Sequence, residues 1–184
     1  MRLLLHTCCA PCSVAVAPRL AAEHELAAFF YNPNIHPYAE FSRRLQAMEQ
    51  LATSIGLALT KREDYGLQDF LEALGSTHQR PARCQFCYRL RLGEAARFAA
   101  ETGHEGLTST LLVSPFQDRE ALGRIGQEEA ARYGLQFLFP DLRPLFREGL
   151  RQAQQQDLYR QRYCGCIFSE YEAEEARRRR VSAR

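Results

Sequence analysis

The sequence predicts an α/β fold in a single domain, built on a mainly parallel sheet that is covered by helices. Short apolar runs with strand character alternate with amphipathic helical patterns along almost the whole chain, which is typical of doubly wound folds. The 184 residues are enough for one domain with a substantial core. Since the chain shows no internal repeat and no low-complexity linker, we interpret 1–184 as one domain.

The expected strands are short and mostly apolar. The first is a run of leucines, the second ends in an asparagine-proline turn, and the fourth is rich in apolar and β-branched residues. The five segments with strand character are 3–6, 25–32, 57–61, 106–115 and 135–140.

Amphipathic patterns between these strands predict the helices. In one of them Phe41, Met48 and Ile55 follow helical spacing, and Gly56 supplies a natural C-terminal stop. Asp118 is placed to cap a later helix. Helices are expected over 13–24, 38–55, 67–74, 85–101 and 118–133, then in an arginine- and glutamine-rich region up to about 159, and in a final charged segment.

The turn after the first strand, HTCCAPCS, occupies the position where a parallel sheet places its site. Parallel strands gather their carboxyl ends at one edge, and sites in such sheets lie beyond that edge. The turn contains no glycine and matches neither G-x-G-x-x-G nor G-x-x-x-x-G-K-[ST], so it is a poor phosphate cradle. It holds three of the seven cysteines instead.

The cysteines are the most unusual feature of the composition, because all of them fall into clusters. An odd number, in a chain whose N-terminus does not have the pattern of a signal peptide, argues against a disulfide framework. Complete clustering indicates metal binding or redox chemistry, and the helix that follows the first cluster is expected to acidify a thiol there. The three clusters are Cys8, Cys9 and Cys12; Cys84 and Cys87; and Cys164 and Cys166.

Three kinds of site are compatible with these residues. A structural zinc site uses paired C-x-x-C hooks, but it takes four thiolates and leaves three unexplained. A thioredoxin-like dithiol needs one C-x-x-C and does not explain three clusters. An iron–sulfur cluster needs several thiolates, and seven could hold one four-iron cluster and leave ligands for a further metal.

The basic residues are unevenly distributed although the net charge is only +2. Ten arginines lie from Arg143 onward, and 177–180 is an unbroken run. This pattern fits either a solvated helix face with a flexible basic tail over 177–184, or an electrostatic footprint for RNA. There is no apolar run long enough for a transmembrane helix, so we expect no membrane partner and a cytoplasmic location.

Five segments resemble, in order, the cobalamin-independent epoxyqueuosine reductase family QueH. They are LLLHTCCAPCS, FFYNPNIHPYAEFSRRL, RCQFCYRLRL, STLLVSPFQD and LYRQRYCGCIFS, and together they cover most of 3–169. The resemblance implies a Rossmann-like domain of the adenine nucleotide alpha hydrolase type with a helical, cysteine-containing C-terminal extension. It also implies reduction of the epoxide of epoxyqueuosine, at the wobble position of a tRNA anticodon, to queuosine. The stretch 141–161 departs from the family pattern, which weakens the transfer of substrate contacts there.

The resemblance further implies a [4Fe-4S] cluster with a neighbouring mononuclear iron, a tRNA substrate and an external electron donor of unknown identity. The implied metal ligands are Cys8, Cys9, Cys12, Cys84, Cys87, Cys164 and Cys166. Epoxide removal requires electrons and protons, so the candidate catalytic residues are Cys9, Cys12 and Tyr163, with Tyr159 and His36 as further proton donors. An alternative is a non-catalytic tRNA-binding module with structural zinc. A tRNA-thiolating enzyme is less compatible, because the glycine-serine ATP loop usual in such enzymes of this fold class is missing.

Substrate contacts are expected from amides and hydroxyls at strand ends and from arginines. The candidates are Asn32, Asn34, Arg43, Arg89, Ser109, Thr110 and Arg160, with Arg91 and Arg162 as further arginines that could meet phosphates. Each also has a purely structural interpretation. The two asparagines could make the turn around Pro33, the serine and threonine could be ordinary strand residues, and Arg43 and Arg91 could be exposed helix positions. His36, in a loop between prolines, is more typical of a surface residue.

Overall fold

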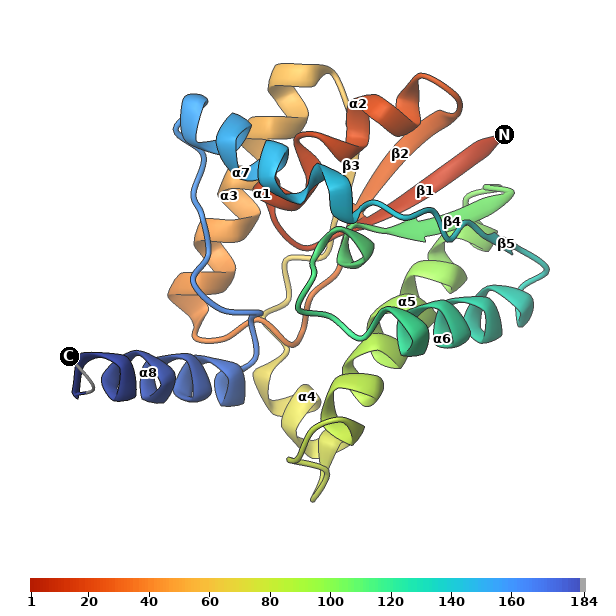
Figure 1. Ribbon diagram of the computed structural model, residues 1–184. Coiled ribbons are helices and arrows are strands. Elements are labelled where there is room, and N and C mark those ends of the chain that lie inside the picture. Colours follow the sequence, from red (N-terminus) through yellow and green to blue (C-terminus); the bar gives the residue numbers. More distant parts are fainter. Residues whose placement is uncertain (183–184) are drawn as a thin grey trace.

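The computed structural model describes residues 1–182 and contains one five-stranded sheet in which every pair of neighbours is parallel (Figure 1). The order is β3-β2-β1-β4-β5, so β1 is central, and its Leu5 lies opposite Ala28 on one side and Thr108 on the other. The strands are β1 (Arg2–Thr7), β2 (Glu25–Phe30), β3 (Ala58–Lys61), β4 (Gly106–Ser109) and β5 (Gln136–Phe137).

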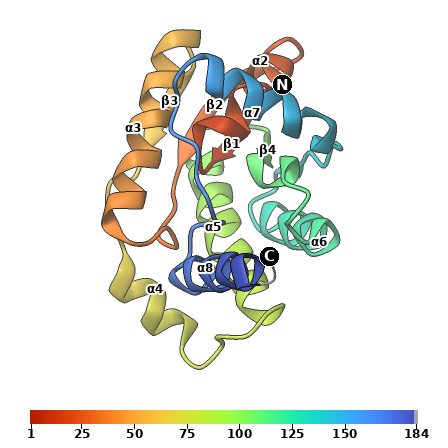
Figure 2. The same cartoon turned by 60° about the vertical axis from the view of Figure 1, so that its left-hand side comes forward.

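Helices cover both faces of the sheet. The α-helices are α1 (Ala10–Ser13), α2 (Val16–Ala21), α3 (Tyr38–Ile55), α4 (Leu67–Leu74), α5 (Ala82–Glu101), α6 (Arg119–Ala131), α7 (Phe146–Gln155) and α8 (Ile167–Ser182), and the 3-10 turns are η1 (Thr110–Val113) and η2 (Arg143–Leu145). The views in Figures 1 and 2 place α1, α2, α3 and α7 over one face and α5 and α6 over the other. This division follows from right-handed crossovers, because the chain leaves β1 toward β3 and later returns to build β4 and β5 on the other side.

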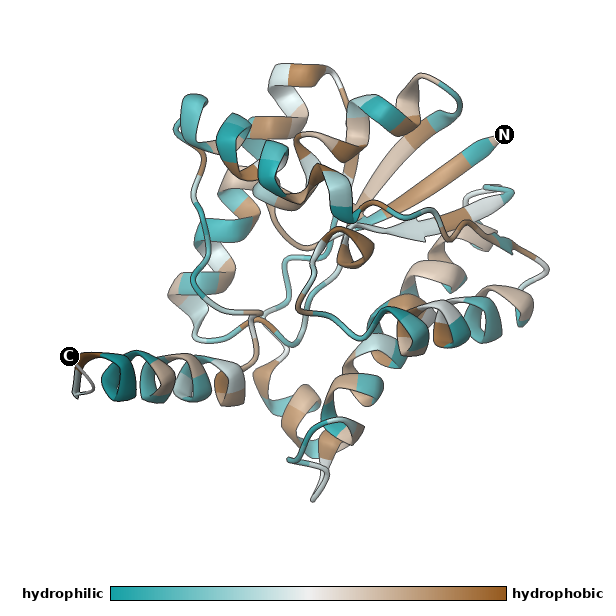
Figure 3. Ribbon diagram, viewed as in Figure 1, coloured by the Kyte–Doolittle hydropathy of each residue, from teal (hydrophilic) through white to brown (hydrophobic). Residues whose placement is uncertain are grey.

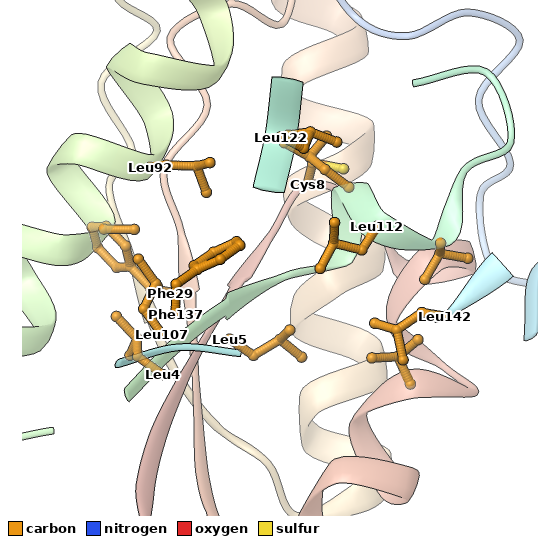
Figure 4. Packing of buried hydrophobic residues seen from close by; sticks show 14 of the residues in the cluster. Leu4, Leu5, Cys8, Phe29, Leu92, Leu107, Leu112, Leu122, Phe137 and Leu142 are labelled. Carbon is orange, nitrogen blue, oxygen red and sulfur yellow. The ribbon is translucent and has the colours of Figure 1, made fainter. Parts of the chain in front are cut away.

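The core lies on both faces of the central strand. Leu3, Leu4 and Leu5 are completely buried, as expected for a strand covered on both sides. Figure 4 shows Leu4 and Leu5 with Phe29 and Leu107 in the larger apolar cluster. Hydrophilic residues gather on the outer helix surfaces and especially toward the end of α8, which extends from the body of the molecule (Figure 3).

The predicted α/β class and the alternation of strands and helices are confirmed. Helices 38–55 and 67–74 have the predicted bounds, Gly56 ends α3 at φ 65°, and the Asp118 side chain caps α6 by accepting from the Ala121 N–H at 3.0 Å. Two of these boundaries rest on local signals, a left-handed glycine and an N-cap carboxylate, that act without help from the rest of the fold.

Three element predictions were wrong in their extent. The helix expected over 13–24 is two short helices, and Pro18 in the second removes one of the backbone donors that a continuous helix would need. The strand expected over 106–115 ends at Ser109, whose hydroxyl accepts from the Leu111 N–H and starts η1. The strand expected over 135–140 is reduced to 136–137 at the sheet edge.

The basic C-terminal segment is helical as far as it is described. Residues 177–182 form the end of α8, and the last two positions of the predicted tail, 183–184, lie outside the described residues. Within 1–182, every helix falls short of the length or the apolar character that crossing a membrane requires.

Candidate metal centre

The three cysteine clusters come from three elements that meet at the carboxyl edge of the central strand. Cys8 and Cys9 directly follow β1, and Cys12 lies in α1. Cys84 and Cys87 lie in the first two turns of α5, one above the other at i and i+3. Cys164 and Cys166 lie in the loop that leads into α8. The edge position predicted for the first cluster is therefore correct, and the fold adds the other two clusters to it.

The thiols influence one another within and between clusters. The Sγ atoms of Cys8 and Cys9 are 3.8 Å apart. Hydrogen bonds from Cys12 and Cys9 lower the pKa of Cys8 well below its usual range, although burial opposes this. Hydrogen bonds to Cys8 and Cys9 raise the pKa of Cys12 well above its usual range. The acidified thiol of this cluster is thus Cys8, which precedes α1, and not Cys12 inside it.

The second and third clusters are also within electrostatic reach of each other. Burial raises the pKa of Cys87 to about 11, and the neighbouring Cys164 contributes to this shift. A hydrogen bond from Cys166, with a second one from Ser169, lowers the pKa of Cys164 to about 5. All seven cysteines are free thiols, and of these only Cys164 is exposed.

The thiols lie near one another, but they do not form a coordination shell for a single metal ion. Within residues 1–182, no three histidine, cysteine or acidic side chains stand at the spacing of ligands to a single metal ion. A multi-iron cluster spreads its ligands more widely than one ion does, because each thiolate binds a different iron atom. The donor set of buried sulfurs from three segments therefore suits a cluster better than one preformed tetrahedral site.

Two polar side chains contact the cysteine sulfurs: Gln161, which the sequence did not indicate as a site residue, and Arg91, which it indicated only as a phosphate contact. Gln161 donates from Nε2 to the Sγ of Cys9 at 3.0 Å, and its buried Oε1 has no partner. Arg91 lies with Nη1 3.9 Å from the Sγ of Cys87 and donates from Nη2 to Asn32 Oδ1 at 2.8 Å. The i, i+4 spacing from Cys87 to Arg91 was the available sequence signal for the arginine; no such signal exists for Gln161.

Arg91 and His36 differ from their expected surface positions. Arg91 is buried in α5, because its guanidinium faces the cysteines and not the solvent. His36 is completely buried, and neither of its ring nitrogens has a hydrogen-bond partner. Its ring lies against the aromatic side chains of Tyr65 and Phe70, with centroids 5.5 and 5.3 Å away. Arg43, in contrast, is exposed, as its helix position indicated.

The two asparagines at the end of β2 have different surroundings. Asn32 donates from Nδ2 to the carbonyl of Thr7 at 2.9 Å and accepts from Arg91, so its amide is fully engaged between β1 and α5. The amide of Asn34 is buried and both of its polar atoms lack a partner. Nδ2 of Asn34 faces the Cys164–Cys166 loop, 3.4 Å from the place that a side chain on Gly165 would occupy.

Two hydroxyl groups at the end of β4 and just after it lie near the first cysteine cluster. The Oγ1 of Thr110 is 3.8 Å from the Sγ of Cys8. The Oγ of Ser109 lies 2.9 Å from Nδ1 of His6 and accepts from the Leu111 N–H. Thr110 therefore faces the cysteines, whereas Ser109 is engaged by neighbouring protein groups.

The loop with the third cluster is fastened to α3 by a buried ion pair. Arg44 pairs with Glu40 at 2.7 Å and donates to the carbonyls of Cys164 and Tyr163, each at 3.0 Å. The hydroxyl of Tyr163 donates to the carbonyl of His36, and the hydroxyl of Tyr159 donates to Glu40. Burial raises the pKa of Tyr163, so this phenol keeps its proton in the ordinary pH range.

The predicted phosphate contacts other than Arg91 have different surroundings. Arg89 points to α6 and forms ion pairs with Glu128 and Glu129 at 2.6 and 2.5 Å. Arg43 lies over the ring of Tyr159, 5.7 Å from its centroid. Arg160 is exposed in the loop that leads to the third cysteine cluster.

Comparison with known proteins places this arrangement in a family. Residues 3–172 match the family model described as Epoxyqueuosine reductase QueH. The chain belongs to the QueH family. A curated QueH protein of Dehalococcoides mccartyi is 36% identical over 173 residues, which cover 93% of each chain. A second, from Thermotoga maritima, is 31% identical over 181 residues, covering 94% of this chain and 92% of the relative. The QueH protein of Helicobacter pylori is 36% identical over 185 residues, but these span only 49% of its length.

A solved structure supports the predicted fold type for this QueH-family chain. The U34-tRNA thiolase NcsA from Methanococcus maripaludis, solved with its [4Fe-4S] cluster, superposes with a TM-score of 0.60 at 16% identity. The match covers 96% of this chain and 65% of the thiolase. At this identity the likeness shows the fold alone, which is the α/β architecture on a parallel sheet that the sequence predicts.

Proposed function

We propose that this protein is an epoxyqueuosine reductase, which reduces the epoxide of epoxyqueuosine at the wobble position of a tRNA anticodon to queuosine. The observation that carries the proposal is that the three cysteine clusters lie within electrostatic reach of Arg91 or of one another near the end of β1, in a chain of the QueH family. The reaction takes two electrons and two protons, breaks both epoxide C–O bonds, leaves an alkene and releases the oxygen as water. A tRNA substrate implies a cytoplasmic location.

The cysteines supply a donor set that suits a [4Fe-4S] cluster together with an adjacent mononuclear iron. The proposed ligands are Cys8, Cys9, Cys12, Cys84, Cys87, Cys164 and Cys166. Support comes from burial of five of the seven, from the mutual effects on their pKa values, and from the cation Arg91 next to Cys87. When bound, the metal centre would supply electrons one at a time from an external donor and a Lewis-acid site for the epoxide oxygen.

Protein groups around the centre are suited to hold protons and to orient the modified base. Tyr163 keeps its phenolic proton and lies in the loop of the third cluster. Cys9 and Cys12 remain candidate catalytic thiols, since Gln161 contacts both sulfurs. The free amide of Asn34 and the hydroxyl of Thr110 face the cysteines, where they could hydrogen-bond the substituent of an unstacked base. We propose Asn32 as the residue that positions Arg91, and Ser109 as a support for His6.

Metal analysis and a turnover assay test this proposal directly. Anaerobically prepared protein is expected to be brown, to hold more than four irons per four sulfides, and to convert epoxyqueuosine in tRNA to queuosine with dithionite as the electron source. Protein treated with a chelator until the iron is removed serves as the control, together with dithionite alone. A colourless protein with stoichiometric zinc that binds tRNA without turnover would contradict the proposal and support a structural-zinc binding module.

A further inference from the structure

Arg91 is a buried cation without an anionic protein partner. It is 3% exposed, on the face of α5 that points to the cysteines. Its two hydrogen-bond partners are the neutral amide of Asn32 and the sulfur of Cys87, and its Nε has no partner. Within the described residues, no carboxylate lies within ion-pair distance of its guanidinium.

The other two buried arginines differ from Arg91 in this respect. Arg44 pairs with Glu40 at 2.7 Å, and Arg83 pairs with Glu172 at 2.6 Å. A buried charge that lacks a counter-charge is strongly destabilising, because the low-dielectric interior does not replace its hydration. The missing counter-charge of Arg91 must therefore come from another anionic group nearby.

The cysteines are the groups that can supply this negative charge. Nη1 of Arg91 lies 3.9 Å from the Sγ of Cys87 in the second cluster. Its Nη2 is bound to Asn32, whose amide donates to the carbonyl of Thr7, the residue before Cys8 of the first cluster. One guanidinium thus lies against the second cluster and is linked to the backbone that leads into the first.

Asn32 fixes the position of the Arg91 guanidinium and links it to the end of β1. Asn32 accepts from Nη2 at 2.8 Å while its own amide donates to the carbonyl of Thr7 at 2.9 Å, just before Cys8. The neighbouring His6 is completely buried, and its ring nitrogens lie 2.9 Å from the Oγ of Ser109 and 3.2 Å from the carbonyl oxygen of Tyr31. His6 therefore faces neutral protein groups and does not supply the missing negative charge.

We propose that Arg91 is the fixed counter-cation of the metal–thiolate centre and that its charge raises the reduction potential of this centre. The inference rests on the proposed function, because it assumes that the cysteines hold a metal group with net negative charge. Adding an electron makes such a group more negative, so a positive charge held beside it in a low-dielectric interior favours the reduced state. Arg91 acts through this charge and through position, and takes no chemical part in the reaction.

Redox titration of matched variants tests the proposal with a readout other than activity. Arg91→Gln removes the charge and keeps a hydrogen-bonding side chain, and Arg91→Lys keeps the charge. The control is Arg97→Gln on the same helix, because Arg97 is neutralised by Glu94 and Glu101 and is 39% exposed. Midpoint potentials of the anaerobic holoproteins are compared, each normalised to its iron and sulfide content.

The expected result is a more negative midpoint potential for Arg91→Gln, with Arg91→Lys close to the parent protein and Arg97→Gln unchanged. A fully loaded Arg91→Gln protein with the parental potential would overturn the proposal, and so would equal shifts in the glutamine and lysine variants. If Arg91→Gln fails to hold the cluster, the lysine variant decides: restored loading supports a charge role, and equally poor loading indicates packing alone.

The outcome can be separated from failure of the proposed function. If the parent protein holds zinc and no iron–sulfur cluster, the reductase assignment fails. The same three variants are then compared by competition with a zinc chelator. Weaker zinc retention in Arg91→Gln alone would still support the counter-cation role, and equal retention in all variants would overturn it.

Discussion

Individual buried polar residues carry much of the information about this site, and several of them have no protein partner. His36 and Asn34 lie next to the loop of the third cysteine cluster with four buried polar atoms between them that lack hydrogen bonds. A buried polar group without a hydrogen bond destabilises the folded state unless a ligand or water binds it. These two side chains therefore lower the stability of the folded protein at this position.

The imidazole of His36 makes the stability of the protein depend on pH. Burial lowers the pKa of His36 to about 4, whereas a histidine in the unfolded chain has a pKa near 6.5. Between these values the unfolded state binds more protons, so the free energy of unfolding falls as the pH falls from about 6.5 toward 4. The effect of one group is at most about 1.4 kcal/mol per pH unit. Urea unfolding at several pH values should show a steeper decline for the parent protein than for His36→Phe. Parallel pH profiles for the two proteins would contradict this prediction.

The residues that sequence reasoning missed are ordinary members of helices and loops until the fold is known. The cysteines could be predicted, because thiols in clusters are rare and chemically distinctive. An arginine on an amphipathic helix is usually solvated, so the helical pattern alone favours an exposed Arg91. Arg91 is buried because α5 packs with this face toward Cys8, and this packing cannot be predicted from the helical pattern. Gln161 and Arg44 are site neighbours for the same reason, because they approach the cysteines only after the C-terminal loop has packed.

At the scale of elements, the predictions succeeded where local signals decide the structure and failed where tertiary packing does. The helices 38–55 and 67–74 have their own periodicity and glycine stops, so their bounds were correct. Strand β4 ends at Ser109, because the Ser109 hydroxyl accepts a hydrogen bond from the Leu111 N–H and starts a 3-10 turn. Strand β5 is short because it lies at the edge of the sheet and pairs only with β4. Apolar residues continue past both ends, which is why hydropathy alone predicted longer strands.

The connection between α3 and the C-terminal cysteine loop is the part of the element packing that is most sensitive to mutation. Arg44 is 1% exposed and Glu40 6%, so Arg44→Met would leave a buried carboxylate without its cation. Breaking such a pair costs about 3–5 kcal/mol, and the carbonyls of Tyr163 and Cys164 are left without their donors as well. We expect a lower urea midpoint and faster trypsin cleavage in the loop at Arg160. Gln50→Met, at an exposed position of the same helix, is the control. Unchanged stability and cleavage would show that the ion pair does not fasten the loop.

At the scale of the whole molecule, the parallel topology brings one cysteine triplet and two cysteine pairs, which are distant in the sequence, near one another. β1 is the middle strand, so the turn after it has neighbours on both sides. Helix α5 brings Arg91 near Cys8 of this turn, and the C-terminal loop brings Gln161 to Cys9. The fold class was therefore enough to predict where the first cluster lies. It was not enough to predict the arrangement of the other two, because both lie outside the strand-end turns.

Two exposed arginines of the C-terminal loop lie close in sequence to the third cysteine cluster. Arg160 and Arg162 are exposed in the loop next to the third cluster and have no ion-pair partner among residues 1–182, whereas most arginines of α5, α6 and α8 pair with nearby glutamates. If the proposed function is correct, this loop presents its charge to the phosphates around the modified base. Phosphate binding contributes affinity that falls with salt, because it releases counterions.

Replacing both loop arginines should therefore weaken tRNA binding and reduce its salt dependence. For Arg160→Gln combined with Arg162→Gln, we expect the slope of log affinity against log salt to decrease by about 1 for each phosphate that the double variant no longer neutralises. The weakening should be similar for different tRNA sequences, since phosphates carry no sequence information. Fluorescence anisotropy with labelled tRNA over a salt series measures the slope. Arg124→Gln is the matched control, because Glu128 pairs with that exposed arginine at 3.0 Å. Equal slopes for the parent and the double variant would place the tRNA backbone elsewhere on the protein.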